Sequence, residues 1–222
     1  MRIGAHYVSL VACAFAMHTA AAQDSLRFSG PDAETSRQVS QIIESAAAAG
    51  LPASHIVAKA QFAALVRTPG PKIVETARAV AARLEIARRS IAPHELANDI
   101  VNAEEALSYN VTPDILRRIS LASPKAPIAV PLSVLTQLAA ARVPIKRAGE
   151  IVLDLVRRGA TPTQFQALGN DVDSDVRLLG AGPLDAANVR YKNLNPFLAP
   201  VNPSSAALDA GFSPSSTGPK KP

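Results

Sequence analysis

Apolar residues recur at helical spacing in short segments along most of this 222-residue chain. The clearest stripe lies in the third of these segments, and its members are Ile73, Ala77, Val80, Leu84 and Ala87. Charged residues occupy the other faces of the same segment, a pattern that is typical of a helix with one buried face. We therefore expect Leu84 to be buried and the adjacent Arg83 to point into solvent.

Prolines mark the starts of these segments. Seven segments begin at or just after a proline, at Pro52, Pro71, Pro93, Pro113, Pro144, Pro162 and Pro183. Proline is tolerated in the first helical turn because that position has no intrahelical N–H bond to lose. Short helices with tight connections predict an all-α fold without a sheet, built either as a compact bundle or as an array of helical hairpins.

The two ends of the chain differ in composition from the rest. Residues 1–22 combine a basic start, an apolar stretch and a run of three alanines that fits a cleavage site, and they predict a secretory signal peptide. A lipoprotein anchored through Cys13 is the minor alternative. We expect a helical domain over 23–194, with a candidate seam at the proline-rich segment 123–131. Residues 195–222 are rich in Pro, Ser and Ala, which predicts a disordered tail.

Composition narrows the classes of function. Cys13 is the one cysteine, so cleavage after residue 22 leaves a chain without disulfides, thiolate metal ligands or a cysteine nucleophile. The net charge of +5 favours anionic partners such as envelope polymers or lipid headgroups. The chain has no tryptophan and few other aromatic residues, so it lacks the stacking platforms of single-strand binders, and we expect no nucleic-acid partner.

No sequence motif predicts a catalytic, cofactor or metal site. His55 and His94 each follow a proline closely, and we interpret both as surface or first-turn histidines because no serine-hydrolase or zinc motif accompanies them. Asp171, Asp173 and Asp175 alternate like the start of a calcium loop, but the glycine and glutamate that such a loop requires are missing. We interpret these acids as first-turn residues of a helix, where they complement its dipole.

Three pairs of adjacent arginines are candidates for contact with an anion. They are Arg88, Arg89, Arg117, Arg118, Arg157 and Arg158. All six lie near expected helix ends, where cations offset the helix dipole, and this structural role is the competing interpretation. Guanidinium groups suit phosphate and carboxylate, so one member of each pair could join an anion-binding patch if the three pairs converge in space.

The segments 49–60 and 71–84, with Ala49-Gly50-Leu51-Pro52 at the first helix boundary, carry a resemblance to known proteins. The chain resembles, over residues 45–190, a group of exported, alanine-rich helical bacterial proteins to which no activity is assigned. The resemblance implies a helical fold and transfers no site residue.

We expect an exported, non-enzymatic helical protein of the bacterial envelope, periplasmic or extracellular, that acts as an interaction or scaffold module. Two alternatives stay open. One is an envelope-directed enzyme that uses an acid such as Glu104 or Asp173 in a cleft, and the other is a basic protein that binds lipid or another anion. A protein or an anionic envelope component fits as partner, and the sequence does not set the oligomeric state.

Overall fold

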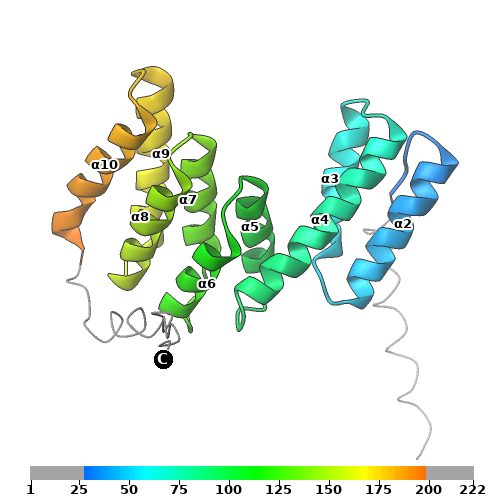
Figure 1. The fold of residues 1–222 in the computed structure, drawn as a ribbon, viewed down its shortest axis with the longest axis horizontal. Helices are drawn as coiled ribbons and strands as arrows, with labels where there is room; N and C mark the ends of the chain where they lie inside the picture. Colours follow the sequence, from blue (N-terminus) through cyan, green and yellow to red (C-terminus); the bar gives the residue numbers. More distant parts are fainter. Residues whose placement is uncertain (1–27, 199–222) are drawn as a thin grey trace, which may run out of the picture. The chain divides into compact units, whose positions relative to one another are not determined.

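The computed structural model describes residues 28–198, and every regular element in that range is a helix (Figure 1). The helices are α2 (Ala33–Ala48), α3 (Ala53–Leu65), α4 (Gly70–Ser90), α5 (Ala97–Ser108), α6 (Pro113–Ala122), α7 (Ala129–Ala140), α8 (Ile145–Arg157), α9 (Pro162–Leu178), α10 (Pro183–Leu194) and the short 3-10 turn η1 (Asn195–Phe197). The all-α prediction is confirmed. The predicted signal peptide and residues 199–222 of the predicted tail lie outside the described residues.

Most of the marked prolines stand at helix starts, as the sequence predicts. Pro113, Pro162 and Pro183 are each the first residue of their helix. The start of α9 adds a capping box, because the side chain of Thr161 accepts from the Gln164 N–H and the Gln164 side chain accepts from the Thr161 N–H. These reciprocal bonds satisfy two N–H groups that a helix start otherwise leaves without partners.

Pro93 is the exception, and the expectation of a helix start there is wrong. Helix α5 begins at Ala97 with Leu96 as its N-cap, so Pro93 lies in the turn between α4 and α5. The same turn contains His94, which the fold buries. The sequence pattern could not distinguish this turn from a helix start because proline is common in both, and here His94, Glu95 and Leu96 separate it from α5.

The chain divides into two compact units, and the division falls within α4, between Ala82 and Arg83. The segment 123–131 lies inside unit 2. In unit 1, α2 packs against α3, and the start of α4 lies against the first turn of α2. A side chain at Gly70 would collide with Thr35, so glycine permits this close approach. Ile43, Ile56 and Ile73 are fully buried in the unit.

Unit 2 is a two-layer array of helices. Helix α7 packs against α5 and α9 in one layer, while α8 packs against α6 and α10 in the other. Contacts of α7 with α8 and of α9 with α10 join the layers. Buried leucines such as Leu116, Leu135 and Leu155 fill the space between them. Of the two predicted architectures, this unit therefore adopts the array of helical hairpins, in which each hairpin contacts its neighbours along the row.

The apolar stripe of α4 is buried as predicted, but the adjacent residue Arg83 does not point into solvent. Leu84 is fully buried. Arg83 is half-buried, and its Nε donates to Oε1 of Glu104 on α5 at 2.7 Å. Glu104 is itself buried. The expectation that Arg83 points into solvent is wrong because a carboxylate on the next helix faces it, which the period of α4 alone cannot reveal.

Candidate functional site

The six candidate arginines are engaged with neighbouring side chains or backbone groups. Arg88 and Arg89 both pair with Glu85, at 2.9 and 3.5 Å, and Arg117 pairs with Asp114 at 2.5 Å. These are contacts within one helix, and such exposed pairs contribute little to stability. Arg118 and Arg157 also have partners. The pairs on α4 and α8 lie at the ends of their helices, which supports the interpretation as helix-end cations. Arg117 and Arg118 lie in the middle of α6, so for this pair the expectation of a helix end is wrong.

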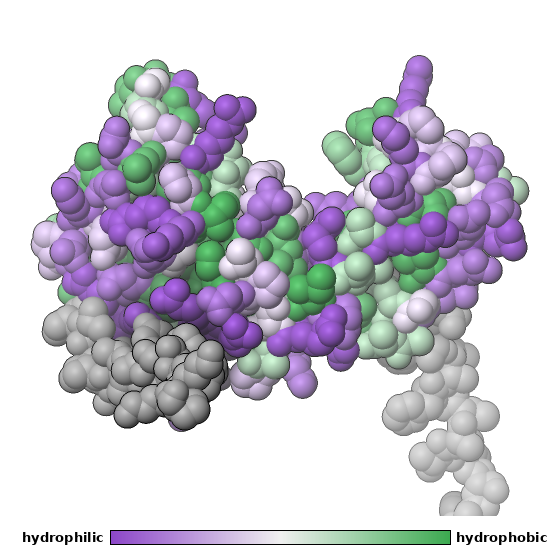
Figure 2. Space-filling view, in the orientation of Figure 1, coloured by the Kyte–Doolittle hydropathy of each residue, from purple (hydrophilic) through white to green (hydrophobic). Residues whose placement is uncertain are grey.

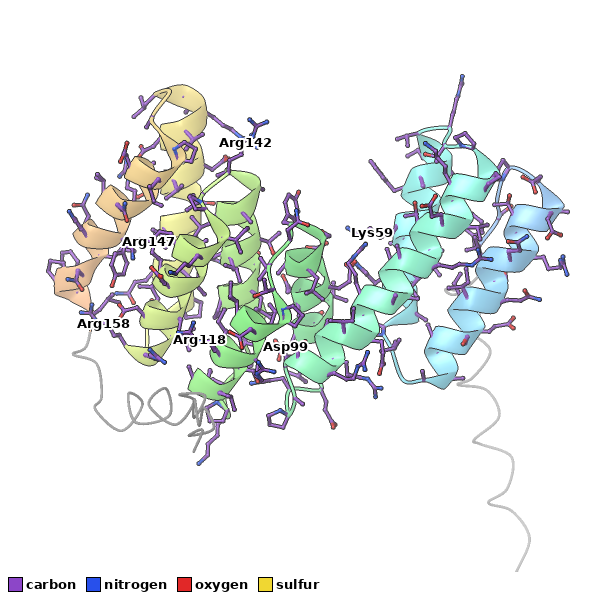
Figure 3. All side chains as sticks on the ribbon, viewed as in Figure 1. Lys59, Asp99, Arg118, Arg142, Arg147 and Arg158 are labelled. Carbon is purple, nitrogen blue, oxygen red and sulfur yellow. The ribbon has the colours of Figure 1, made fainter. Side chains whose placement is uncertain are left out.

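Arg158 differs from the other five because it ties the end of α8 to the chain that follows α10. Its guanidinium donates to the carbonyl oxygens of Asn195 at 2.9 Å and Leu198 at 3.2 Å, and it also pairs with Asp154 at 3.6 Å. Figure 3 shows Arg158 and Arg147 on α8 beside α10. The predicted tail thus begins with an ordered turn, η1, over Asn195–Phe197.

A polar seam runs between α8 and α10. Arg147 donates to Asn188 Oδ1 at 2.8 Å, and its guanidinium carbon lies 5.6 Å from the centroid of the Tyr191 ring, which is a cation–π contact. The Tyr191 hydroxyl donates to Asp154 Oδ2 at 2.6 Å. Burial raises the pKa of Tyr191, and the hydrogen bond to the Asp154 carboxylate raises it further. The seam therefore links α8 and α10 through polar and cation–π contacts.

The three alternating aspartates do not lie in a first helical turn, so that expectation is wrong. They lie in the last two turns of α9, which begins at Pro162. Asp175 accepts two hydrogen bonds of 2.6 Å from Arg190 on α10, and Asp171 accepts a third from the same guanidinium at 3.3 Å. The hydrogen bonds from Arg190 hold the pKa of Asp175 below its usual value. Asp173 pairs with Arg177 at 2.8 Å on its own helix.

A cluster of buried polar residues surrounds the α4–α5 turn. Asp99 is fully buried, and its Oδ1 accepts from the backbone N–H of Ile128, which precedes α7, at 3.1 Å. His94 Nδ1 lies 3.7 Å from the other Asp99 oxygen. Ser120 Oγ on α6 donates to the carbonyl oxygen of Ile91 at 2.8 Å. The cluster joins α4, α5, α6 and α7 around one turn.

This cluster corrects the interpretation of His94 as a surface or first-turn histidine. His94 and Ser120 are both buried, and the Ser120 hydroxyl is directed to a backbone carbonyl and not to an imidazole. A Ser-His-Asp triad needs the hydroxyl hydrogen-bonded to the imidazole and open to a substrate carbonyl. Although the three residue types coincide, their arrangement is therefore that of a structural cluster. Asp99 carried no sequence signal, since its partners are far along the chain.

Exposed apolar side chains gather at two hairpin tips, one in each unit. At the α9–α10 tip, Leu178 and Leu179 are 80 % and 75 % exposed, and Leu184 is also exposed. At the α3–α4 tip, Phe62, Leu65 and Val66 are exposed in the same way. Figure 2 shows apolar surface at the ends of these hairpins. Neither set could be found from the sequence, because helical periodicity identifies apolar residues without showing which of them the fold covers.

The part of the chain described here contains no helix that is long and apolar enough to cross a membrane. Among the same residues, no three histidine, cysteine or acidic side chains are grouped so as to hold a metal ion. The chain matches no protein-family model, and it shows no significant similarity to a curated protein or to a solved structure. The resemblance to exported helical proteins stays a prediction.

Proposed function

We propose that this chain is an exported, non-enzymatic helical protein of the bacterial cell envelope that acts as an interaction or scaffold module. The observation that carries the proposal is the α9–α10 tip, where Leu178, Leu179 and Leu184 are exposed together. Apolar side chains clustered at one end of a hairpin gain free energy when a partner removes them from water. We define these three leucines as the leucine tip.

The leucine tip is held rigid close to its apex. Arg190 on α10 binds Asp175 on α9 through two hydrogen bonds, only three residues before Leu178 in the sequence. The N–H of Ala181 donates to the Asp175 carbonyl oxygen at 3.0 Å, and Gly180 supplies the positive φ of 67° that the turn requires. A surface that is ordered before binding loses less conformational entropy when a partner docks, which favours a contact role.

The two candidate acids of the enzyme alternative have structural partners, which supports the non-enzymatic proposal. Glu104 is buried in its pair with Arg83, and Asp173 is bound to Arg177. Both carboxylates therefore have structural partners within the fold. Export rests on the sequence of residues 1–22, and N-terminal sequencing of the protein recovered from the envelope or medium tests it. A mature chain that starts at Gln23 is expected. A retained Met1 would contradict export, whereas a lipidated Cys13 would contradict cleavage after residue 22 and support the lipoprotein alternative.

The contact role is tested by affinity capture from envelope extract with the mature chain as bait. The test variant is Leu178→Ser with Leu179→Ser. The matched control is Leu96→Ser with Leu121→Ser, which removes two exposed leucines elsewhere in unit 2. We expect the wild type and the control to retain the same proteins and the tip variant to lose them, with all three chains melting at similar temperatures. Equal capture by the tip variant would contradict the proposal.

A further inference from the structure

The α3–α4 tip of unit 1 is apolar on a face that the core does not use. Phe62, Leu65 and Val66 lie at i, i+3 and i+4, so they share one side of the C-terminal end of α3. They are 65 %, 80 % and 56 % exposed. Ala60 and Ala63 on the same helix are buried, which shows that the core-facing side of α3 is a different one.

Two cations follow these apolar residues in the sequence, one in the α3–α4 turn and one in the first turn of α4. Arg67 and Lys72 are exposed, and neither side chain forms a hydrogen bond or an ion pair within residues 28–198. Arg67 ends the helix with a positive φ of 59°, and its N–H donates to the Ala64 carbonyl oxygen at 2.9 Å, so the turn itself is ordered. We define Phe62, Leu65, Val66, Arg67 and Lys72 as the basic tip.

The acids near the basic tip leave its charge positive at the apex. Asp32 lies beside Gly70 at the start of α4, and its oxygens accept from the N–H of Thr35 at 2.7 Å and from its hydroxyl at 2.8 Å. Its single negative charge is smaller than the two positive charges of Arg67 and Lys72. Glu75 follows Lys72 by one turn along α4, away from the apex. The leucine tip differs, because Asp185 is exposed next to Leu184 and Arg177 is bound to Asp173. Charge therefore distinguishes the two tips.

We infer that the basic tip binds the surface of an anionic phospholipid bilayer. Apolar side chains that project from an ordered turn enter the boundary between headgroups and acyl chains, and adjacent Arg and Lys side chains contact lipid phosphates at headgroup depth. The three apolar residues and two free cations of the basic tip match these two requirements. Binding is peripheral, and it uses residues of unit 1, whereas the leucine tip belongs to unit 2.

The experiment uses the absence of tryptophan from the sequence. The variant Phe62→Trp, in the chain from Gln23 onward, places one tryptophan in the basic tip, and Leu179→Trp places one in the leucine tip as the matched control. Emission is recorded with vesicles of phosphatidylglycerol and phosphatidylethanolamine, and with vesicles of phosphatidylcholine alone. A blue shift reports transfer of the indole from water into the bilayer.

We expect a blue shift of Phe62→Trp with the anionic vesicles only, and none for Leu179→Trp. Replacing Arg67 and Lys72 by Ser in the Phe62→Trp chain should weaken vesicle binding about twenty-fivefold, since each basic residue near an anionic bilayer contributes about fivefold. No shift at position 62, or equal shifts at both positions, would overturn the inference. A shift that grows with protein concentration without lipid would also overturn it, since the tip would then contact a second copy. Protein capture through the leucine tip is unaffected by either result.

Discussion

The buried carboxylate of Asp99 caps a helix that lies 29 residues further along the chain, because its Oδ1 accepts the N–H of Ile128 at 3.1 Å. Ile128 is the N-cap residue of α7 and offers no side-chain acceptor of its own. The start of a helix leaves N–H groups without intrahelical partners and attracts negative charge. Asp99, in the first turn of α5, thus supplies for α7 the acceptor that a Glu or Gln at the third helical position provides in a capping box.

We expect Asp99→Ala to destabilise the protein by about 1–3 kcal/mol, because it leaves a buried N–H group of α7 without its acceptor. Asp99→Asn keeps an oxygen that can accept this hydrogen bond, so it should cost less. The measurement is the free energy of unfolding in urea. The neighbouring exposed residue provides the control, and Asn98→Ala should change stability by no more than about 0.5 kcal/mol. Equal effects of the alanine variants at 98 and 99 would contradict the capping role.

The pair of adjacent residues Arg83 and Leu84 provides a second test of the packing. Leu84→Ala removes a fully buried side chain and leaves a cavity, so we expect a loss of roughly 2–5 kcal/mol. Arg83→Ala removes the ion pair to buried Glu104, and we expect about 1–3 kcal/mol. Arg89→Ala, on the exposed side of the same helix, should cost about 0.5 kcal/mol or less. An Arg83 variant as stable as the Arg89 variant would show that the pair to Glu104 contributes nothing.

Local features of this fold could be predicted from the sequence, and contacts between distant segments could not. The buried face of α4 follows from the spacing of Val80, Leu84 and their neighbours, and the start of α9 follows from Pro162, since both depend on residues within a few positions. The partner of Arg83 is 21 residues away and that of Ile128 is 29 away. Such pairs depend on how helices pack, so neither the burial of His94 nor the role of Asp99 had a sequence signal.

The two tips were missed for a related reason. Periodicity identifies apolar faces of a helix but does not show which of them the fold covers. Helix α3 has one apolar face that is buried and another that is exposed. Leu178 and Leu179 follow Val172 along α9, and only the packing of α10 determines that the helix end extends beyond the core.

The salt bridge between Arg190 and Asp175 predicts a defined pH dependence. Because Arg190 lowers the pKa of Asp175 below its ordinary 3.8, the ionised carboxylate stabilises the folded state above that pH, and the contribution is lost as the pH falls further. We expect Arg190→Gln to be less stable than the wild type at pH 7, and the difference to narrow below pH 3.8. Urea unfolding between pH 7 and pH 3 measures it.

The control for this pH series is Arg177→Gln, which removes the exposed pair with Asp173 and should change stability little at any pH. A difference in unfolding free energy between the wild type and Arg190→Gln that stays constant down to pH 3 would show that Arg190 does not lower the pKa of Asp175.

The polar seam between α8 and α10 predicts that the free energy of unfolding decreases as the pH rises in the alkaline range. Burial and the Asp154 carboxylate raise the pKa of Tyr191 above 10.0, so the folded protein keeps a proton that the unfolded chain releases, and stability falls as the pH rises past that value. The titration of Tyr191 is measured by phenolate absorbance, as the difference between the wild type and the Tyr191→Phe variant. Asp154→Asn should move the Tyr191 midpoint to lower pH, and an unchanged midpoint would mean that burial alone sets it.

The central claim, that the leucine tip is a contact surface for a protein of the envelope, is tested most directly by photo-crosslinking in cells. A photoreactive amino acid replaces Leu178 in one strain and Ser174, an exposed residue one turn earlier on α9, in a second. We predict that illumination produces a discrete product of higher mass from position 178 and none from position 174. The absence of a product at 178, or the same products at both positions, would contradict the account.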